Sequence, residues 1–137
     1  LDDNCNAVVD GVPFEAGGYA AQETYFYIYC AEAMSGHGYR DIYLYIGDTP
    51  RLETYTLADP PAEIGPNPGA WGYHTVIAPG QEPPGVTYST SASSTGILTI
   101  TRYDPSARRI SGSFSFSATS SVGSVDVTKG VFTDAAW

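Results

Sequence analysis

Two segments of the chain carry tyrosine at every second position, Tyr25-Phe26-Tyr27-Ile28-Tyr29 and Tyr43-Leu44-Tyr45-Ile46. Strict alternation places successive side chains on opposite faces of a β-strand, so each segment predicts a strand with one aliphatic and one aromatic face. We expect these strands near 23–31 and 40–47, paired as a hairpin or meander. The aliphatic face is the predicted core and consists of Phe26, Ile28, Cys30, Ile42, Leu44 and Ile46.

The reverse side of the same two strands is predicted to be a sheet of tyrosine rings. Its members are Tyr25, Tyr27, Tyr29, Tyr43 and Tyr45, and Trp71 is expected to add a larger ring. A buried aromatic ring covers roughly 150–250 Å², whereas the largest apolar patch on a typical monomer is about 300–600 Å². We therefore expect a cover over these rings: the chain's own loops, a ligand or a second copy.

The composition indicates a single all-β domain over residues 1–137. Charged residues make up only 15% of the chain, which contains 15 glycines and 10 prolines, and β-forming residues dominate the patterned segments. The spacing predicts an antiparallel β-sandwich of about ten short strands, Ig-like or jelly-roll-like, with meander or Greek-key connections. Further strands are predicted at 7–14 (a hairpin around Asp10-Gly11), 54–57, 71–77, 86–90, 96–103, 109–118, 123–128 and 131–133.

Residues 58–85 interrupt this pattern because they are rich in proline and glycine. Proline cannot donate a hydrogen bond to a neighbouring strand, which argues against a central strand through most of the segment. We expect a long surface excursion in which 71–77 is the one plausible strand.

The two cysteines, Cys5 and Cys30, allow a disulfide that closes a loop of 25 residues. In the chain-entropy model such a bridge contributes about 3 kcal/mol, and it would place the protein outside the cytoplasm. Two reduced, buried thiols are the alternative. The chain begins at Leu1 without an initiator methionine, which we interpret as a mature exported chain, and no apolar segment approaches the ~20 residues of a membrane span.

The strand at 109–118 alternates core residues with Ser111, Ser113, Ser115 and Ser117, which form a flat, uncharged face. This face is a second candidate interface, and a solvated strand face is the alternative. The formal net charge is −9 and Lys129 is the only lysine. Nothing in the chain could neutralise a phosphate backbone, so nucleic-acid binding is not expected, and few lysines protect the sheet edges from association.

Three segments of the C-terminal half, GILTITRYD (96–104), RISGSFSF (109–116) and VTKGVFT (127–133), follow an early VDGVPF (9–14). Together these residues resemble uncharacterised secreted or lipid-anchored β-domains of Bacteroidota-type bacteria. The resemblance implies an exported β-domain on or near a cell surface and supplies no catalytic residues. Cys5 follows four residues rather than opening the chain, which departs from the lipid-anchored members.

The leading functional hypothesis is a non-enzymatic extracellular structural protein that self-associates as a filament or surface-layer subunit. The tyrosine face, the serine face and strand addition by residues 1–9 or 131–137 are the candidate contacts. The alternative is a cell-surface module that binds a glycan or another ligand on the tyrosine rings. A hydrolase using His37, His74 or Glu53 is a third hypothesis, although no nucleophile-elbow motif occurs. We expect no metal and no cofactor.

Overall fold

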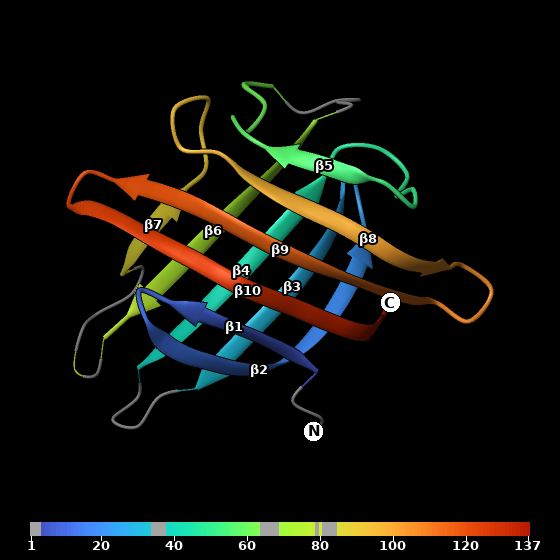
Figure 1. Ribbon diagram of the computed structural model, residues 1–137, viewed down its shortest axis with the longest axis horizontal. Coiled ribbons are helices and arrows are strands. Elements are labelled where there is room, and N and C mark those ends of the chain that lie inside the picture. Colours follow the sequence, from blue (N-terminus) through green and yellow to red (C-terminus); the bar gives the residue numbers. More distant parts are fainter. Residues whose placement is uncertain (1–3, 34–37, 64–68, 79, 81–84) are drawn as a thin grey trace.

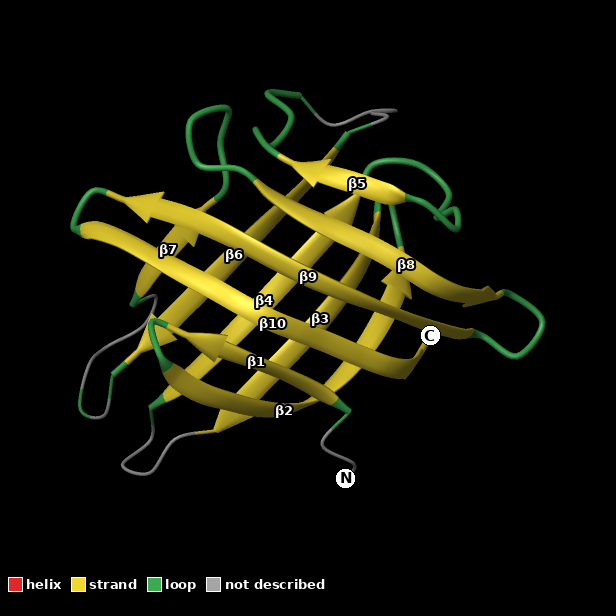
Figure 2. Ribbon diagram, in the orientation of Figure 1, coloured by secondary structure: helices red, strands yellow, loops and turns green. Residues whose placement is uncertain are grey.

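The computed structural model describes residues 4–33, 38–63, 69–78, 80 and 85–137, and these residues form strands and loops without a helix. Strands make up most of the described chain, and loops join their ends (Figure 2). The all-β prediction is confirmed. The ten strands of the described part are β1 (Cys5–Val9), β2 (Val12–Gln22), β3 (Phe26–Ala33), β4 (Tyr39–Ile46), β5 (Thr54–Leu57), β6 (Ala70–Ile77), β7 (Val86–Ser89), β8 (Gly96–Asp104), β9 (Arg109–Ser120) and β10 (Gly123–Ala136).

All ten strands belong to one mixed sheet that folds over into two layers. Strands β8, β9 and β10 cross steeply over β3, β4 and β6 (Figure 1). Pairing is antiparallel except for two single parallel contacts, between β10 and β2 and between β5 and β6. Strand β2 passes from one layer to the other, because residues 12–16 pair with β1 and residues 17–22 pair with β3. Hydrogen bonds therefore run continuously between the layers, which are not two separate sheets.

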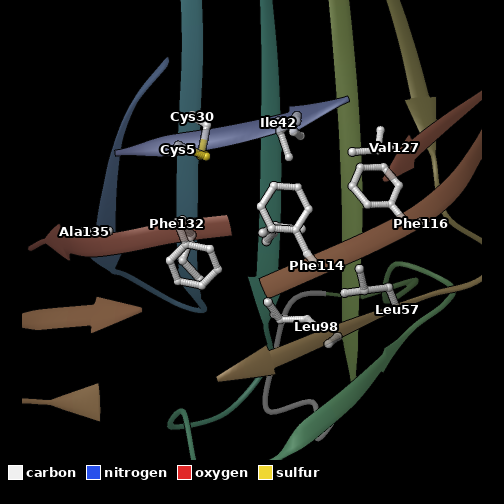
Figure 3. Packing of buried hydrophobic residues seen from close by; sticks show 14 of the residues in the cluster. Cys5, Cys30, Ile42, Leu57, Leu98, Phe114, Phe116, Val127, Phe132 and Ala135 are labelled. Atoms are coloured by element: carbon white, nitrogen blue, oxygen red, sulfur yellow. A yellow bond between two sulfur atoms is a disulfide. The ribbon is translucent and has the colours of Figure 1, made fainter. Parts of the chain in front are cut away.

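The core lies between the two layers. The register of β3 and β4 pairs Phe26 with Ile46 and Ile28 with Leu44, which turns these four side chains inward. All six residues of the predicted aliphatic face are at most 1% exposed, which confirms them as core. The opposite layer contributes Phe114 and Phe116 of β9 and Val127 and Phe132 of β10, which are seen in Figure 3.

The predicted disulfide between Cys5 and Cys30 is present and fully buried, which excludes the reduced-thiol alternative. The Cα atoms of the two cysteines lie 6.1 Å apart, and the bond links β1 to β3. Because β1 and β3 flank β2 on its two sides, the disulfide fixes β2 where it crosses between the layers.

Strand β10 differs from the sequence prediction, which placed separate strands at 123–128 and 131–133. The structure shows one strand, and within it Lys129 and Asp134 adopt left-handed backbone conformations, with φ angles of 54° and 51°. The register against β9 shifts near both residues. Each bulge inserts a residue and breaks strict alternation, so the pattern looks interrupted although the strand continues.

The predicted excursion of residues 58–85 contains strand β6, which pairs with β4 along its whole length and with β7 on its other side. This part of the segment is therefore an interior strand of the sheet, and the described residues 58–63 lie outside it. Residues 64–68, 79 and 81–84 fall outside the described residues.

Both terminal strands complete the chain's own sheet. Strand β1 lies between β2 and β10, and β10 lies between β1 and β9. Strand addition to a neighbour by residues 5–9 or 131–136 would first require breaking these pairings. No helix in the described residues is long and apolar enough to cross a membrane.

Candidate functional site

The outward side chains of β2, β3, β4 and β6 form two cross-strand rows of aromatic residues. One row pairs Tyr27 with Tyr45 and Tyr45 with Trp71. The other row runs from β2 to β6 through Tyr19, Tyr29, Tyr43 and Tyr73. Together with Tyr25, whose ring contacts Tyr45 and Trp71, these residues make up what we call the aromatic face: Tyr19, Tyr25, Tyr27, Tyr29, Tyr43, Tyr45, Trp71 and Tyr73.

The structure thus brings together all six aromatic residues that the sequence predicted and adds Tyr19 and Tyr73. Tyr73 follows Trp71 by two residues within one strand, so the alternation rule applied to β6 would have found it. Tyr19 has no aromatic residue two positions away. Only the register of β2 against β3, which places it opposite Tyr29, adds it to the face.

The rings of the aromatic face pack against one another. Ring centroids are 4.4 Å apart between Tyr29 and Tyr43 and 5.7 Å apart between Tyr43 and Tyr45. Tyr45 stacks on Trp71 at 5.4 Å with an interplanar angle of 6°. Such pairs contribute about 0.5–1.5 kcal/mol each beyond area burial, so the face is held rigid before any partner arrives.

Exposure differs across the face. Tyr19 is 47% exposed, whereas Trp71 is only 2% exposed. Trp71 therefore supports the neighbouring rings and does not present a flat surface of its own, in contrast to the expected role as a large stacking platform.

A hollow of about 370 Å³ lies at the Trp71 end of the aromatic face. Its lining consists of Thr24, Tyr25, Tyr45, Pro60, Pro61, Ala62, Glu63, Trp71 and Tyr73. The Tyr25 hydroxyl donates a hydrogen bond to the Glu63 carbonyl oxygen at 3.3 Å. Residues 60–63 of the predicted excursion thus border this end of the face and form one wall of the hollow.

Two tyrosine hydroxyls of the aromatic face, those of Tyr29 and Tyr43, are held in their neutral form. Burial, aided by the neighbouring phenol and by Asp41, raises the pKa of Tyr29 and of Tyr43 to about 12. Asp41 is 3% exposed and accepts a hydrogen bond from the Thr75 amide at 3.1 Å. Burial raises the pKa of this carboxyl, and hydrogen bonds from Thr75 and Tyr39 oppose the shift. The Tyr29 and Tyr43 phenols are therefore uncharged near neutral pH.

The predicted serine face lies on the outward side of β9, on the other layer. Ser111, Ser113, Ser115 and Ser117 are partly or fully exposed and alternate with buried residues, as the pattern predicts. Two of them bond within the chain: the Ser117 hydroxyl donates to an Asp126 carboxylate oxygen at 2.6 Å, and the Ser111 hydroxyl accepts from the Asp134 amide at 2.8 Å. The serine face is thus partly engaged with β10.

The candidate hydrolase residues are not brought into one site. His74 is 1% exposed, and its Nδ1 lies 2.8 Å from the Asp41 carbonyl oxygen. Burial lowers the pKa of this imidazole. Glu53 is exposed on the loop before β5, and His37 lies outside the described residues. Within the described part of the chain, no three His, Cys, Asp or Glu side chains are grouped to hold a metal ion.

The fold and the site define a disulfide-bonded, all-β protein with an aromatic outer face. The sequence profile of one family, a domain of unknown function (DUF6252), matches residues 4–136. The chain belongs to this family. Comparison with characterised proteins gave no match, and comparison with solved structures gave none.

Proposed function

We propose that this protein is a non-enzymatic, exported structural protein that self-associates through its aromatic face, with a second copy as the occupant. The observation that carries the proposal is the aromatic face itself: eight rings on adjoining strands, packed against one another and mostly half-buried. Rigid rings lose little conformational freedom on binding, which is why tyrosine is effective at protein interfaces.

The polar groups of this face are complementary to themselves. A tyrosine hydroxyl both donates and accepts hydrogen bonds, so a surface tipped with such hydroxyls can pair with its own copy. Among the outward positions of β2, β3, β4 and β6 in the described chain, two carry carboxyls: the buried Asp41 of β4 and the exposed Glu15, in the part of β2 that pairs with β1. The net charge of −9 therefore lies mostly elsewhere, and two copies could meet here with little like-charge repulsion.

The exposed area of the rings alone is smaller than the area that a stable interface buries. Half-buried rings of roughly 150–250 Å² each leave on the order of 500 Å² available in total. A standard interface buries about 800 Å² per partner, so residues around the rings must contribute the remainder.

The serine face supplies a possible second contact on the opposite layer. One contact produces a closed dimer, whereas two different contacts on opposite sides produce a filament or a sheet. The buried disulfide supports export, because such bonds form in oxidising compartments. The resemblance to secreted or lipid-anchored bacterial β-domains supports a position on or near a cell surface.

The experiment compares the unaltered protein with a Tyr29→Ser/Tyr43→Ser variant and a Leu52→Ser control, by light scattering after size exclusion and by electron microscopy near neutral pH. Tyr29 and Tyr43 are central in the aromatic face and do not line the hollow, and Leu52 is a 67% exposed loop residue. We expect particles larger than the 14.6 kDa chain for the unaltered protein and the control, and loss of assembly in the double variant. Circular dichroism checks that the variant is folded.

Two results would overturn the proposal: a monomeric unaltered protein, or normal assembly of the double variant.

The hollow beside Trp71 favours a second candidate function, a surface module that binds a small ligand. Among the described residues, its polar side chains are Thr24, Glu63 and the tyrosine hydroxyls. A glycan is less favoured, because these described lining residues include no planar amide or guanidinium side chain to fix sugar hydroxyls and Trp71 offers no open ring face.

A further inference from the structure

The hollow at the end of the aromatic face is bordered by rings in two perpendicular orientations. The Tyr25 ring stands at 87° to Trp71, with centroids 4.9 Å apart, and at 83° to Tyr45. The Tyr73 ring stands at 86° to Tyr45, with centroids 5.8 Å apart. Tyr45 and Trp71 are parallel. Trp71 is 2% exposed and packs against these rings, so Tyr25, Tyr45 and Tyr73 are the aromatic side chains that border the open space, with Pro60 and Pro61 as an apolar wall.

Rings set at right angles around a small space are suited to a cation without hydrogen-bond donors. The face of an aromatic ring carries negative charge density and attracts a cation within about 6 Å of its centroid. A primary ammonium would also require several acceptors for its N–H groups, whereas a methylated ammonium requires apolar contact. Pro60, Pro61 and Ala62 supply that contact.

The charges around the hollow favour a cation over an anion. Among the described residues that line it, Glu63 is the one acidic residue, and no arginine or lysine takes part. The carboxylate of Glu23 also acts on Tyr45, whose pKa is raised chiefly by burial. The whole chain carries a net charge of −9, which raises the local concentration of cations.

We propose that this hollow binds a quaternary ammonium group, such as the trimethylammonium of choline or of a choline headgroup. Its volume of about 370 Å³ is that of a small-ligand site. The inference rests on the second candidate function given above and requires no second copy, and it concerns the end of the aromatic face at which Tyr25, Tyr45, Trp71 and Tyr73 line the hollow.

The first test compares choline with 3,3-dimethylbutan-1-ol, which has the same shape without the charge. Calorimetry gives the two affinities, and proton NMR follows the methyl signal of each probe. We expect choline to bind at least about tenfold more tightly, with its methyl signal shifted upfield by the rings. Equal binding of the two probes, or no binding of choline, would overturn the proposal.

Variants locate the site. Tyr73→Leu keeps an apolar side chain but removes a ring, and we expect about a tenfold loss of choline affinity, whereas Tyr73→Phe should bind as the unaltered protein does. Tyr29→Leu is the matched control, since Tyr29 belongs to the aromatic face but does not line the hollow. Equal losses in Tyr73→Leu and Tyr29→Leu would show that choline does not bind in this hollow.

Two further experiments separate loss of assembly from loss of choline binding, and a lipid headgroup from a free ligand. The Tyr29→Ser/Tyr43→Ser variant should still bind choline, so that loss of assembly and loss of the ligand are distinguished. Sedimentation with phosphatidylcholine vesicles, abolished by Tyr73→Leu, would identify a lipid headgroup as the source of the cation. Choline binding without vesicle sedimentation would identify a free quaternary ammonium compound.

Discussion

The outer faces of the two layers are built on similar strands but differ in what they present. On β3 and β4 the outward positions carry tyrosine rings in mutual contact, as at Tyr29 and Tyr43, 4.4 Å apart. On β9 the outward positions carry serines, and the β8 residues that face them are mixed: Thr99 faces Ser113, whereas Ile97, which is 51% exposed, faces Ser115. The inner faces of both layers are equally apolar and buried.

This difference shows that packing constrains the inner positions of the strands more than the outer positions. Inner positions must fill the space between the layers, so both layers use aliphatic residues and phenylalanine. Outer positions are not bound by that requirement, and small polar residues suffice where only solvent is met. A layer that places rings outward exposes apolar area that water does not favour, which is why the aromatic face is the stronger functional signal.

The largest expected effect separates inner from outer positions on one strand. Phe132 of β10 is fully buried, and its neighbour Val131 is 47% exposed. We expect Phe132→Ala to lower the free energy of unfolding by about 3–5 kcal/mol through lost burial and a cavity, and Val131→Ala to change it by no more than about 0.5 kcal/mol. Urea denaturation measures both. Similar losses at the two positions would contradict the inward and outward assignment.

The second prediction compares the centres of the two outer faces. Tyr43 has ring contacts with Tyr27, Tyr29 and Tyr45, whereas Ser113 is exposed. We expect Tyr43→Leu to cost about 1–2 kcal/mol of unfolding free energy from lost ring pairs, and Ser113→Ala to be nearly neutral. Chemical denaturation of both variants at the same pH provides the measurement. A neutral Tyr43→Leu would mean that the rings gain little from one another and that the aromatic face is not rigid.

Much of the fold could be predicted from the sequence because alternation is a local signal. The tyrosine strands, the serine strand and the disulfide between Cys5 and Cys30 all follow from spacing along the chain. The bulges in β10 could not be predicted, because Lys129 and Asp134 adopt left-handed angles without the glycine that usually marks them.

Alternation along each strand also predicted part of the candidate site. Alternation identifies which side chains share a face of one strand but not which strands are neighbours. The addition of Tyr19 depends on the pairing of β2 with β3, and the hollow depends on Pro60 and Pro61 returning beside Trp71. Contacts of this kind are set by tertiary packing, which leaves no periodic signature.

The smallest expected effect is absent at neutral pH and appears only at high pH, where the tyrosines of the aromatic face titrate and the serines of the other face do not. Burial raises the pKa of Tyr29 and Tyr43 from 10.0 to about 12 in the folded protein. The unfolded chain releases these protons more readily, so the stability they contribute is complete below pH 10 and is lost as the pH rises towards 12. Absorbance of tyrosinate should show a group of phenols that ionise late, with Tyr29 and Tyr43 among them, because burial also raises the pKa of Tyr45 and Tyr73.

The matched variant is Tyr29→Phe/Tyr43→Phe, which keeps both rings and removes both titrating hydroxyls. We expect it to show a smaller late phase in the absorbance titration and to unfold at a higher pH than the unaltered protein, because no phenol remains to favour the unfolded state at these two positions. Ionisation of all 11 tyrosines near pH 10 without unfolding would mean that the rings are as solvated as free phenol. In that case the aromatic face would be an open, wet surface, and the proposed contact with a second copy would lose its physical basis.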